Sequence, residues 1–369
     1  MDYCMNIIVF DTAADSSGAL VELARFHDET APLTRQKINW FYILGKAQLE
    51  ISENENIKIF RFSWTKKNWL YRLIFDYYFS DRIAWKLNAD AIISLQNIRL
   101  PVRNKPQLLY VQLCFPFIKY KFKIFEPKLW VYQNVIKLFI KRSIKKANII
   151  VVQTEWMKQA CIRATNVLES NFKVLTPTIE IPILENRFSF TEDHRRTFFY
   201  PATAMSYKNH RLLINAFADL VHQTSNDYRL ILTLKGNENR ASRLCKIMAL
   251  KFGLDVDFRG TIPRAEVLRL YSKSILIFPS LLETVGLPLI EAMAIGTIVI
   301  AYDSEYSREV LSGYSDAYFF KTKQELVSLM LAVSSKDFQY HGGIKIEQRK
   351  TETWESIIND FIKELDYQK

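Results

Sequence analysis

Cysteine is scarce in this sequence and is not arranged for metal or disulfide chemistry. Cys4, Cys114, Cys161 and Cys245 are scattered along the chain, with no CxxC pair and no ligand spacing to a histidine. Disulfide frameworks and zinc sites both require such spacing, so we expect neither. Scattered thiols fit a reducing compartment best, and we therefore expect a cytoplasmic protein.

Long apolar runs are also missing. The N-terminus carries Asp2 and lacks a basic region, and the run 7–10 is too short for a signal peptide or a membrane span. No other segment reaches the length of a spanning helix, and there is no internal repeat or low-complexity tract. With 369 residues, 49% of them hydrophobic, the chain is instead long enough to bury two cores, and we expect two domains.

Strand-like and helix-like segments alternate along the chain, which predicts parallel α/β domains. The expected strands are 6–10, 57–62, 91–95, 108–112, 149–154, 197–201, 229–234, 256–259, 275–278 and 297–301. The longest expected helices are 69–87 and 128–146. Because prolines and acidic residues interrupt the pattern at 177–192, we predict an N-terminal domain at 1–180, a C-terminal domain at 190–350 and a last helix at 351–369.

The most informative segment is a turn between an expected buried strand and an expected helix. The strand is 275–278; Pro288 suits the first turn of the helix, and Gly296 suits its C-terminal cap. Free backbone N–H groups at such a helix start bind phosphate oxygens, helped by the helix dipole and by the flexible Gly286. The turn therefore predicts an anion site.

Two carboxylates bracket that turn. Glu283 lies at its beginning, and Glu291 is expected in the first turn of the helix. Carboxylates accept hydrogen bonds from sugar or ribose hydroxyls, so the pair points to a nucleotide-sugar site. Taken alone, a glutamate near a helix start also complements the dipole without any further role.

The stretch 258–310 resembles the nucleotide-binding core of the retaining GT-B glycosyltransferases of family 4. Their mark is a pair of glutamates separated by seven residues, here Glu283 and Glu291 within FPSLLETVGLPLIEAMAIGTIVIAYDSEYSREVL. The resemblance implies an α/β GT-B fold of two Rossmann-like domains facing a central cleft, with ligands at the carboxyl ends of the strands. It also implies that the last helix crosses back to the first domain, where Trp354 would anchor the hinge.

The same resemblance assigns roles in the donor site. Lys208 and Glu283 would be the catalytic residues, Lys208 stabilising the leaving diphosphate and Glu283 orienting the donor sugar, while Glu291 would hold the ribose diol. The donor-binding residues that it implies are Ser17, Gly18, Lys208, Ile262, Glu283, Thr284, Val285, Gly286, Leu287 and Glu291. Ala202 stands near the position of an arginine that is common in the family. We expect His210 to be a helix-surface or capping residue.

The first half of the chain departs more from the family pattern. The loop after the first strand has one glycine, Gly18, where two are common, with Ser17 beside it as a donor. Gln112 stands near the position at which many relatives carry a histidine. It would contact the donor sugar or the acceptor by hydrogen bonds alone, because an amide does not shuttle protons. Asn97 is a second candidate of that kind.

The function implied is a retaining transfer from a UDP- or GDP-linked sugar to a saccharide or lipid-linked oligosaccharide acceptor, in O-antigen or capsule type synthesis. No DxD-type carboxylate pair follows a strand, and relatives stabilise the leaving diphosphate with cationic side chains and helix dipoles, so no obligatory metal and no other cofactor is expected. Two alternatives stay open: a GT-B-like sugar-nucleotide epimerase, and a catalytically silent relative acting as a membrane-associated partner.

The positive charge is concentrated in the first half. Of the net charge of +11, residues 1–190 contribute 27 Lys and Arg against 17 Asp and Glu. Much of it lies in 117–146, where aromatic residues alternate with cations and Glu126 is the one acidic residue. A basic, aromatic helix suits an anionic membrane surface, and the alternative is a solvated helix whose aromatics pack inward. No nucleic-acid partner is expected, because no recognition motif accompanies the charge.

Overall fold

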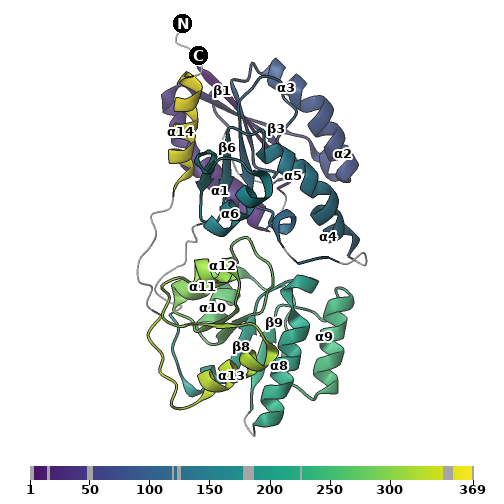
Figure 1. Cartoon of the computed structure of the whole chain (residues 1–369), viewed down its shortest axis with the longest axis vertical. Coiled ribbons are helices and arrows are strands. Elements are labelled where there is room, and N and C mark those ends of the chain that lie inside the picture. The colour runs from purple at the N-terminus through teal and green to yellow at the C-terminus, as the bar shows by residue number, and fades with distance from the viewer. Residues whose placement is uncertain are drawn as a thin grey trace. The chain divides into compact units, whose positions relative to one another are not determined.

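The computed structural model describes residues 4–14, 17–47, 53–118, 120–122, 126–177, 187–224, 227–343 and 352–367. The chain divides into two compact units (Figure 1). The first comprises Met1–Pro177 and Lys350–Lys369, and the second comprises Thr178–Arg349. Each unit contains one parallel β-sheet with helices packed on it.

The sheet of the first unit has seven strands in the order β3-β2-β1-β4-β5-β6-β7. They are β1 (Met5–Asp11), β2 (Ile38–Leu44), β3 (Ile57–Arg61), β4 (Ala91–Ser94), β5 (Gln107–Val111), β6 (Ile149–Val152) and β7 (Phe172–Val174). All neighbouring strands are parallel, and most of their residues are buried, which explains their nearly continuous apolar runs. The order reverses between β1 and β4, the point at which such sheets bind ligands.

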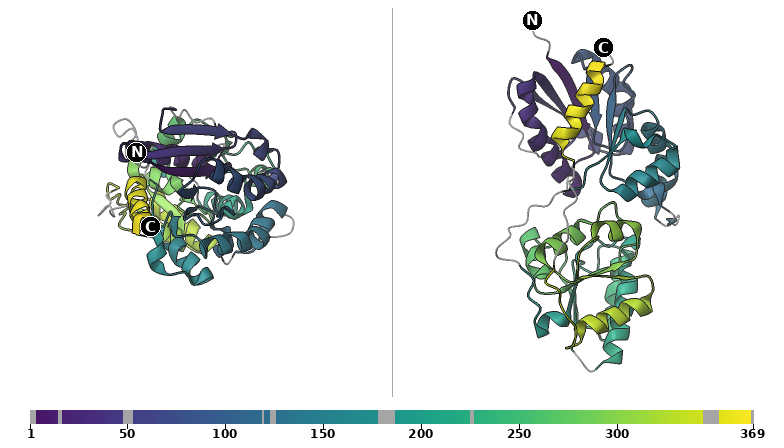
Figure 2. Two further views of the ribbon diagram at one scale, coloured as in Figure 1. Left: turned by 90° about the horizontal axis from the view of Figure 1, so that it is seen from above. Right: turned by 60° about the vertical axis from the view of Figure 1, so that its left-hand side comes forward.

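One face of this sheet is covered by α1 (Ser17–Thr30) and α14 (Trp354–Tyr367), which lie side by side (Figure 2). Trp354 is fully buried, with its ring centroid 5.0 Å from that of Phe26 and 5.2 Å from that of Tyr110. Its indole N–H donates a 2.9 Å hydrogen bond to Glu22 Oε1. The last helix is therefore an integral part of the core of the first unit.

Two interrupted helices cover the opposite face. The first consists of α2 (Trp69–Ile74), the π-helical turn η3 (Phe75–Phe79) and α3 (Ser80–Lys86); the second consists of α4 (Pro127–Val131), the π-helical turn η5 (Tyr132–Ile136) and α5 (Lys137–Ile144). Phe75 packs in one cluster with Ile8 and Ile92, on the half of the sheet around β1 and β4. Ile140 packs in a second cluster with Leu109, over β5 and β6, beside α6 (Glu155–Thr165).

The sheet of the second unit has six parallel strands in the order β10-β9-β8-β11-β12-β13. They are β8 (Thr197–Tyr200), β9 (Arg229–Leu232), β10 (Val256–Phe258), β11 (Ile275–Phe278), β12 (Val299–Tyr302) and β13 (Ala317–Phe320). The helices are α7 (Glu192–Arg195), α8 (His210–Gln223), α9 (Arg240–Lys251), α10 (Arg264–Tyr271), α11 (Leu287–Ile295), α12 (Glu305–Val310) and α13 (Lys323–Ser334). Here the order reverses between β8 and β11, so the loops that follow these two strands are neighbours at one edge.

The predicted α/β class with parallel sheets is confirmed. Three strands were not predicted: β2, β7 and β13. The aromatic run of β2 has no clear period, because the strand is almost entirely buried, and the three residues of β7 are too few to show one. Among the described residues, no helix is long and apolar enough to cross a membrane.

Candidate functional site

The turn between β11 and α11 is shaped by one glycine. Gly286 caps α11 with φ 80° and ψ 68°, a left-handed conformation that is costly for residues with a side chain. A Cβ atom there would lie 3.3 Å from Leu289 Cδ1 and 3.4 Å from Phe278 Cε1. Pro288 lies in the first turn of α11 and Gly296 caps its end with φ 89°, as predicted for both residues.

Lys208 and Glu283 meet at this edge of the sheet. Lys208 ends the short 3₁₀ helix η7 (Ser206–Lys208) after β8, Glu283 lies in the loop after β11, and the Lys208 ammonium donates to Glu283 Oε1. Both side chains are only 15% exposed. Ser280 Oγ donates a second hydrogen bond of 2.6 Å to the same carboxylate oxygen. The site thus presents a cation and an acceptor that are already oriented.

Backbone contacts hold the two loops together. The N–H of Leu281 donates to the carbonyl oxygen of Tyr207 at 2.8 Å. Tyr200, fully buried in β8, donates its hydroxyl to the carbonyl oxygen of Lys208 at 2.9 Å. The loops that carry Lys208 and Glu283 are therefore fixed to each other by hydrogen bonds.

Glu291 lies in the second turn of α11, which corrects the predicted position in the first turn. The helix begins at Leu287, immediately after the Gly286 cap, and Glu291 follows four residues later. Its carboxylate accepts hydrogen bonds from Arg264 Nε and from the Tyr271 hydroxyl, both at 3.3 Å. Burial raises the pKa of Glu291, and Arg264 opposes this shift. Neither Arg264 nor Tyr271 was predicted, since both come from α10, outside the loop that carries the motif.

His210 was expected to be a helix-surface or capping residue, and the surface position was wrong. The residue begins α8 but is only 4% exposed, with its ring 4.8 Å from that of Tyr200. Burial, together with the charge of Lys208, lowers the pKa of His210 to about 3, so the imidazole is neutral near pH 7. Its Nε2 atom has no hydrogen-bond partner within the described part of the chain.

The loop after β9 binds the carboxylate of one of its own residues, Glu238. The backbone N–H groups of Lys235, Gly236 and Asn237 donate to the carboxylate of Glu238 over 2.5, 3.0 and 3.1 Å. Burial opposes ionisation, but hydrogen bonds from the backbone N–H groups of Lys235, Glu238 and Asn237 and from the Ser242 side chain lower the pKa of Glu238 to about 2. The residue was not predicted, because its role depends on backbone geometry.

The other expected donor contacts of the second unit lie on loops, except Leu287, which begins α11. Ile262 is half-buried between β10 and α10, Val285 is buried and Leu287 is exposed. Thr284 is half-buried. Ala202, which replaces the expected arginine, donates its N–H to Thr233 Oγ1 at 2.9 Å. The structure thus brings Lys208, Glu283 and the Gly286 turn together, with Glu291 further along α11.

In the first unit, the expected residues occupy the same kind of edge. Ser17 and Gly18 open α1, and Gly18 is exposed, with no other atom within 4 Å of the position that a Cβ atom would take. Asn97 has a φ of 67°, and its Oδ1 accepts the N–H of Gln112 at 2.7 Å. Gln112 in turn donates through Nε2 to the carbonyl oxygen of Leu95 at 3.1 Å. Both amides therefore hold the loops after β4 and β5.

A polar cluster at this edge was missed by the sequence analysis. Gln96 Oε1 accepts from the Thr12 hydroxyl at 2.9 Å, and Gln96 Nε2 donates to Asp76 Oδ1 at 3.2 Å. Asp11 lies beside Thr12 and is 1% exposed; burial raises its pKa to about 7, although the Ala14 N–H and Arg72 oppose this. Single polar residues on separate segments gave no local pattern from which to predict the cluster.

Comparison with known proteins gives a family match in the second unit. Residues 183–341 match the family model described as Glycosyl transferases group 1. The O-antigen chain mannosyltransferase RfbU of Salmonella typhimurium is 22% identical over 240 residues, which are 65% of this chain and 64% of the relative. The match therefore spans slightly less than two thirds of that protein.

Solved structures resemble the chain over almost its whole length. The sucrose-phosphate synthase of Thermosynechococcus elongatus gives a TM-score of 0.70 at 14% identity, covering 99% of this chain and 100% of that one. The Anabaena protein Alr3699/HepE, in complex with UDP-glucose, gives 0.63 at 14% identity, covering 99% and 98%. The fold is GT-B-like, and residues 183–341 are similar to the glycosyl transferases group 1 family, in agreement with the resemblance seen in the sequence.

Proposed function

We propose that the protein is a retaining glycosyltransferase. It moves a sugar from a UDP- or GDP-linked donor to a saccharide or lipid-linked oligosaccharide acceptor, in the synthesis of a cell-surface polysaccharide of the O-antigen or capsule type. The match of residues 183–341 to the glycosyl transferases group 1 model supports the reaction class. The name of the Salmonella relative supports the polysaccharide, and the UDP-glucose complex of the Anabaena protein supports a nucleotide-sugar donor.

The observation that carries the proposal is the Lys208–Glu283 pair beside the Gly286 turn. A lysine, a helix N-terminus and two glutamates at the reversal point of a parallel sheet offer groups for both halves of a nucleotide sugar. The N–H groups of Val285, Gly286 and Leu287 and the Lys208 ammonium suit a diphosphate. The two carboxylates suit hydroxyl groups.

Each residue then has a defined task. Glu291 holds the ribose diol, and hydrogen bonds from Arg264 and Tyr271 orient its carboxylate for this role. Glu283 orients the donor sugar through its hydroxyls. Lys208 lies between this carboxylate and the diphosphate, so its charge stabilises the negative charge that grows on the leaving group.

The transfer requires one bond to break and one to form. The bond between the anomeric carbon and the diphosphate oxygen breaks, and the acceptor hydroxyl oxygen bonds to the same carbon from the same face, so configuration is retained. The hydroxyl proton passes to the departing phosphate oxygen, which makes a protein base unnecessary. Gln112 agrees with this scheme, since it offers hydrogen bonds but no proton transfer.

The test begins with the nucleotide. Thermal-shift and calorimetric titrations of the full chain with UDP, GDP and ADP should show stabilisation by one diphosphate class, lost or weakened in Glu291→Ala. Asp255→Ala, which removes an exposed carboxylate before β10 in the same unit, is the matched control and should bind normally. Absence of any shift with all three nucleotides would overturn the proposal.

The second step separates transfer from the alternative reactions. With the sugar form of the nucleotide that binds, products should appear only when a saccharide or lipid-linked acceptor is added, and the activity should survive EDTA. Conversion of the donor alone into an isomer would identify an epimerase instead. Binding without turnover under any acceptor condition would favour a silent relative.

A further inference from the structure

The helices on the outer face of the first unit expose an unusual number of apolar side chains. Of the 21 large hydrophobic residues that are exposed among the described residues, eight lie between positions 70 and 85 and five between 130 and 139. Trp85 is 82% exposed, Tyr77 68% and Leu138 66%. Scattered exposed apolar residues are normal, but a concentration on two segments marks an interaction surface.

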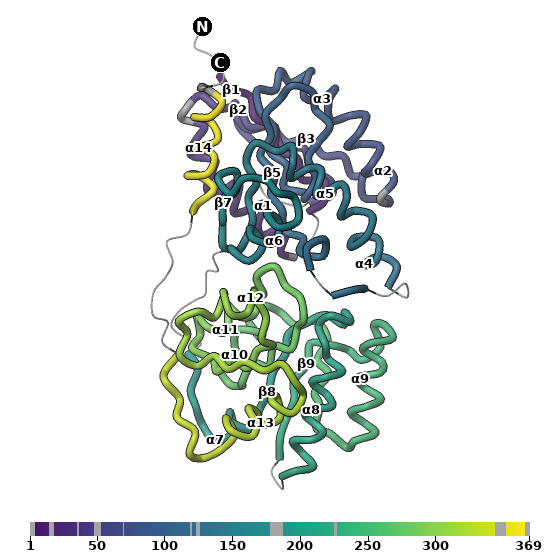
Figure 3. The backbone as a smooth tube through the Cα atoms, in the orientation of Figure 1, coloured from purple at the N-terminus to yellow at the C-terminus, as the bar shows by residue number. Residues whose placement is uncertain are grey.

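The two segments lie on the same side of one sheet. The α2–α3 helix packs over β1 and β4 through the cluster that contains Phe75, and the α4–α5 helix packs over β5 and β6 through the cluster that contains Ile140. Since β4 and β5 are adjacent strands, the two helices cover neighbouring halves of the same face (Figure 3). The exposed side chains of 70–85 and 130–139 are called the outer helical face below.

Positive charge accompanies this apolar surface. The segment 127–148 contains Lys128, Lys137, Lys141, Arg142, Lys145 and Lys146 and no carboxylate. Burial, with the neighbouring charges of Lys137 and Lys145, lowers the pKa of Lys141, so these cations repel one another without a partner of opposite charge on their own helix. A pocket adjoins these cations, and the one described residue of α6 that lines it is Ala164, which carries no charge.

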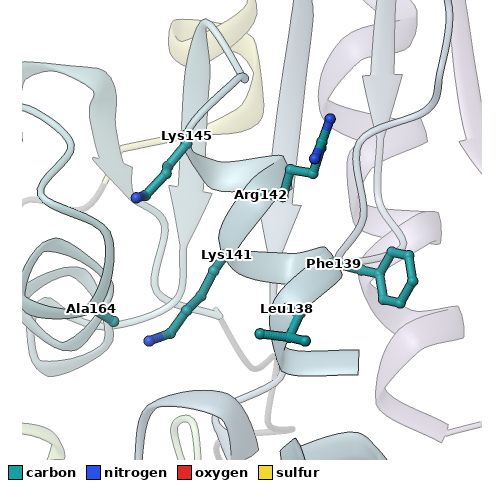
Figure 4. Close-up of a pocket in the computed structure, with 6 residues that line it drawn as sticks. All are labelled: Leu138, Phe139, Lys141, Arg142, Lys145 and Ala164. Atoms are coloured by element: carbon teal, nitrogen blue, oxygen red, sulfur yellow. The ribbon is translucent and has the colours of Figure 1, made fainter. Parts of the chain in front are cut away.

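That pocket shows how the cations are arranged. It measures about 430 Å³ and is lined by Leu138, Phe139, Lys141, Arg142, Lys145 and Ala164. Lys141 of α5 and Lys145, which caps the end of this helix, extend toward the side of Ala164, whereas Phe139 and Arg142 extend to the other side of the helix (Figure 4). Two ammonium groups thus point into one space next to the exposed Leu138.

The carboxylates of the other helix are directed elsewhere. Asp76 of η3 accepts from Gln96, and Asp81 of α3 accepts the backbone N–H of Arg103 at 3.0 Å. Arg82 and Lys86 are exposed on the same helix. The charge that the α2–α3 helix presents to solvent is therefore also positive.

We propose that the outer helical face docks the protein onto an anionic lipid surface, with Lys141 and Lys145 binding lipid phosphate groups. Exposed aromatic and aliphatic side chains enter the boundary between headgroups and acyl chains, while cations above them bind the phosphates. Charge complementarity selects this partner. A second copy of the chain would bring two like-charged faces together, and a nucleic acid would leave the aliphatic residues Leu138 and Val135 without an apolar environment.

The inference does not depend on the transfer reaction, so it is tested by binding. The full chain is sedimented with vesicles of phosphatidylcholine alone and of phosphatidylcholine with phosphatidylglycerol, at low and high salt. We expect sedimentation with the anionic vesicles only, and weaker binding at high salt. Equal binding to both vesicle types, or to neither, would overturn the proposal.

Two double variants separate charge from apolar contact. Each cation near an anionic surface contributes about fivefold to the affinity for the membrane. The double variant Lys141→Gln with Lys145→Gln should therefore lower the affinity for anionic vesicles about 30-fold. Leu138→Ser with Phe139→Ser should lower it about tenfold at constant charge. Their matched controls change exposed residues of α9 in the second unit. These double variants, Arg243→Gln with Lys251→Gln and Ile247→Ser with Leu250→Ser, should bind the vesicles as the wild type does.

Three further measurements control for folding, for binding of free phosphate and for self-association. Circular dichroism and the nucleotide thermal shift show that each variant is folded, and a misfolded Leu138→Ser/Phe139→Ser protein leaves the lysine variant to decide. Inorganic phosphate at millimolar concentration should not release the protein from vesicles; complete release would indicate a free-phosphate site and contradict docking. Sedimentation velocity should show the same oligomeric state for wild type and variants, and a dimer that Leu138→Ser/Phe139→Ser dissociates would assign the face to self-association.

Discussion

Lys208 and Glu283 form an ion pair between two loops that are 75 positions apart in the sequence. Each neutralises the charge of the other, and Ser280 adds a hydrogen bond to the carboxylate. A bound diphosphate would share the lysine with the glutamate, and the donor sugar would share the glutamate with the lysine. In the proposed function, the pair would therefore connect binding of the phosphate to placement of the sugar.

This arrangement predicts different effects for its two members. Glu283→Gln should change the affinity for the nucleoside diphosphate less than about threefold, because the phosphate contacts remain, but should lower kcat by about 10²–10³, since the sugar loses its charged acceptor. Lys208→Ala should weaken both nucleotide binding and kcat by tenfold or more. Calorimetry with the diphosphate and initial rates with the sugar donor measure the two effects.

Lys273→Ala, at an exposed position of the same unit, serves as the control and should leave both quantities unchanged. If Glu283→Gln weakened diphosphate binding as much as Lys208→Ala, the separation of roles would be wrong.

Gly286 is expected to matter for both stability and nucleotide binding. An alanine would have to adopt φ 80°, at a cost of about 1–2 kcal/mol, and its methyl group would press on Leu289 and Phe278. Gly286→Ala should therefore lower the free energy of unfolding by at least that amount and displace the N–H groups that we propose bind the diphosphate.

Gly253 provides the matched control, because its φ is 64° and no atom lies within 4 Å of its Cβ position. Gly253→Ala should show the cost of the backbone conformation alone, with normal nucleotide affinity. Chemical denaturation and calorimetry on both variants separate the two contributions; equal affinities in the two would argue against a binding role for the turn.

The buried Asp11 predicts a pH dependence of stability. Its pKa is about 7 in the folded protein against an ordinary value of 3.8, chiefly because of burial. The folded state then binds more protons than the unfolded state between these values, so the contribution of Asp11 falls as pH rises from about 4 to about 7, by on the order of 4 kcal/mol. Above pH 7 it is constant.

Asp11→Asn should remove this dependence, since the amide oxygen still accepts the Ala14 N–H, which lies 3.0 Å from Asp11 Oδ1. Thermal denaturation from pH 4 to pH 8 should show the variant gaining stability relative to the wild type as pH rises. The exposed Asp28→Asn in α1 is the control, and parallel curves for Asp11→Asn and wild type would contradict the assignment.

The sequence allowed prediction of those features whose signal is local. The α/β class, the Gly286 turn and the caps of α11 depend on consecutive residues, and the structure has them. The Asp11, Gln96 and Asp76 cluster depends on the order of strands in the sheet, which no single segment encodes. His210 was misplaced for the same reason: its burial follows from packing on Tyr200, not from its position at a helix start.

The last helix should be required for the first unit and not for the second. Trp354→Ala would leave a cavity between Phe26 and Tyr110 and remove a donor from the buried Glu22, so we expect a loss of about 3–5 kcal/mol in the first unit. Trp354→Phe would keep the ring packing but lose the hydrogen bond, and should cost less. Limited proteolysis followed by mass spectrometry identifies which unit is cleaved, and the nucleotide thermal shift reports on the second. Cleavage confined to residues of the first unit, with nucleotide binding preserved, is the expected result, whereas simultaneous loss of nucleotide binding would show that α14 also stabilises the unit that carries Lys208 and Glu283.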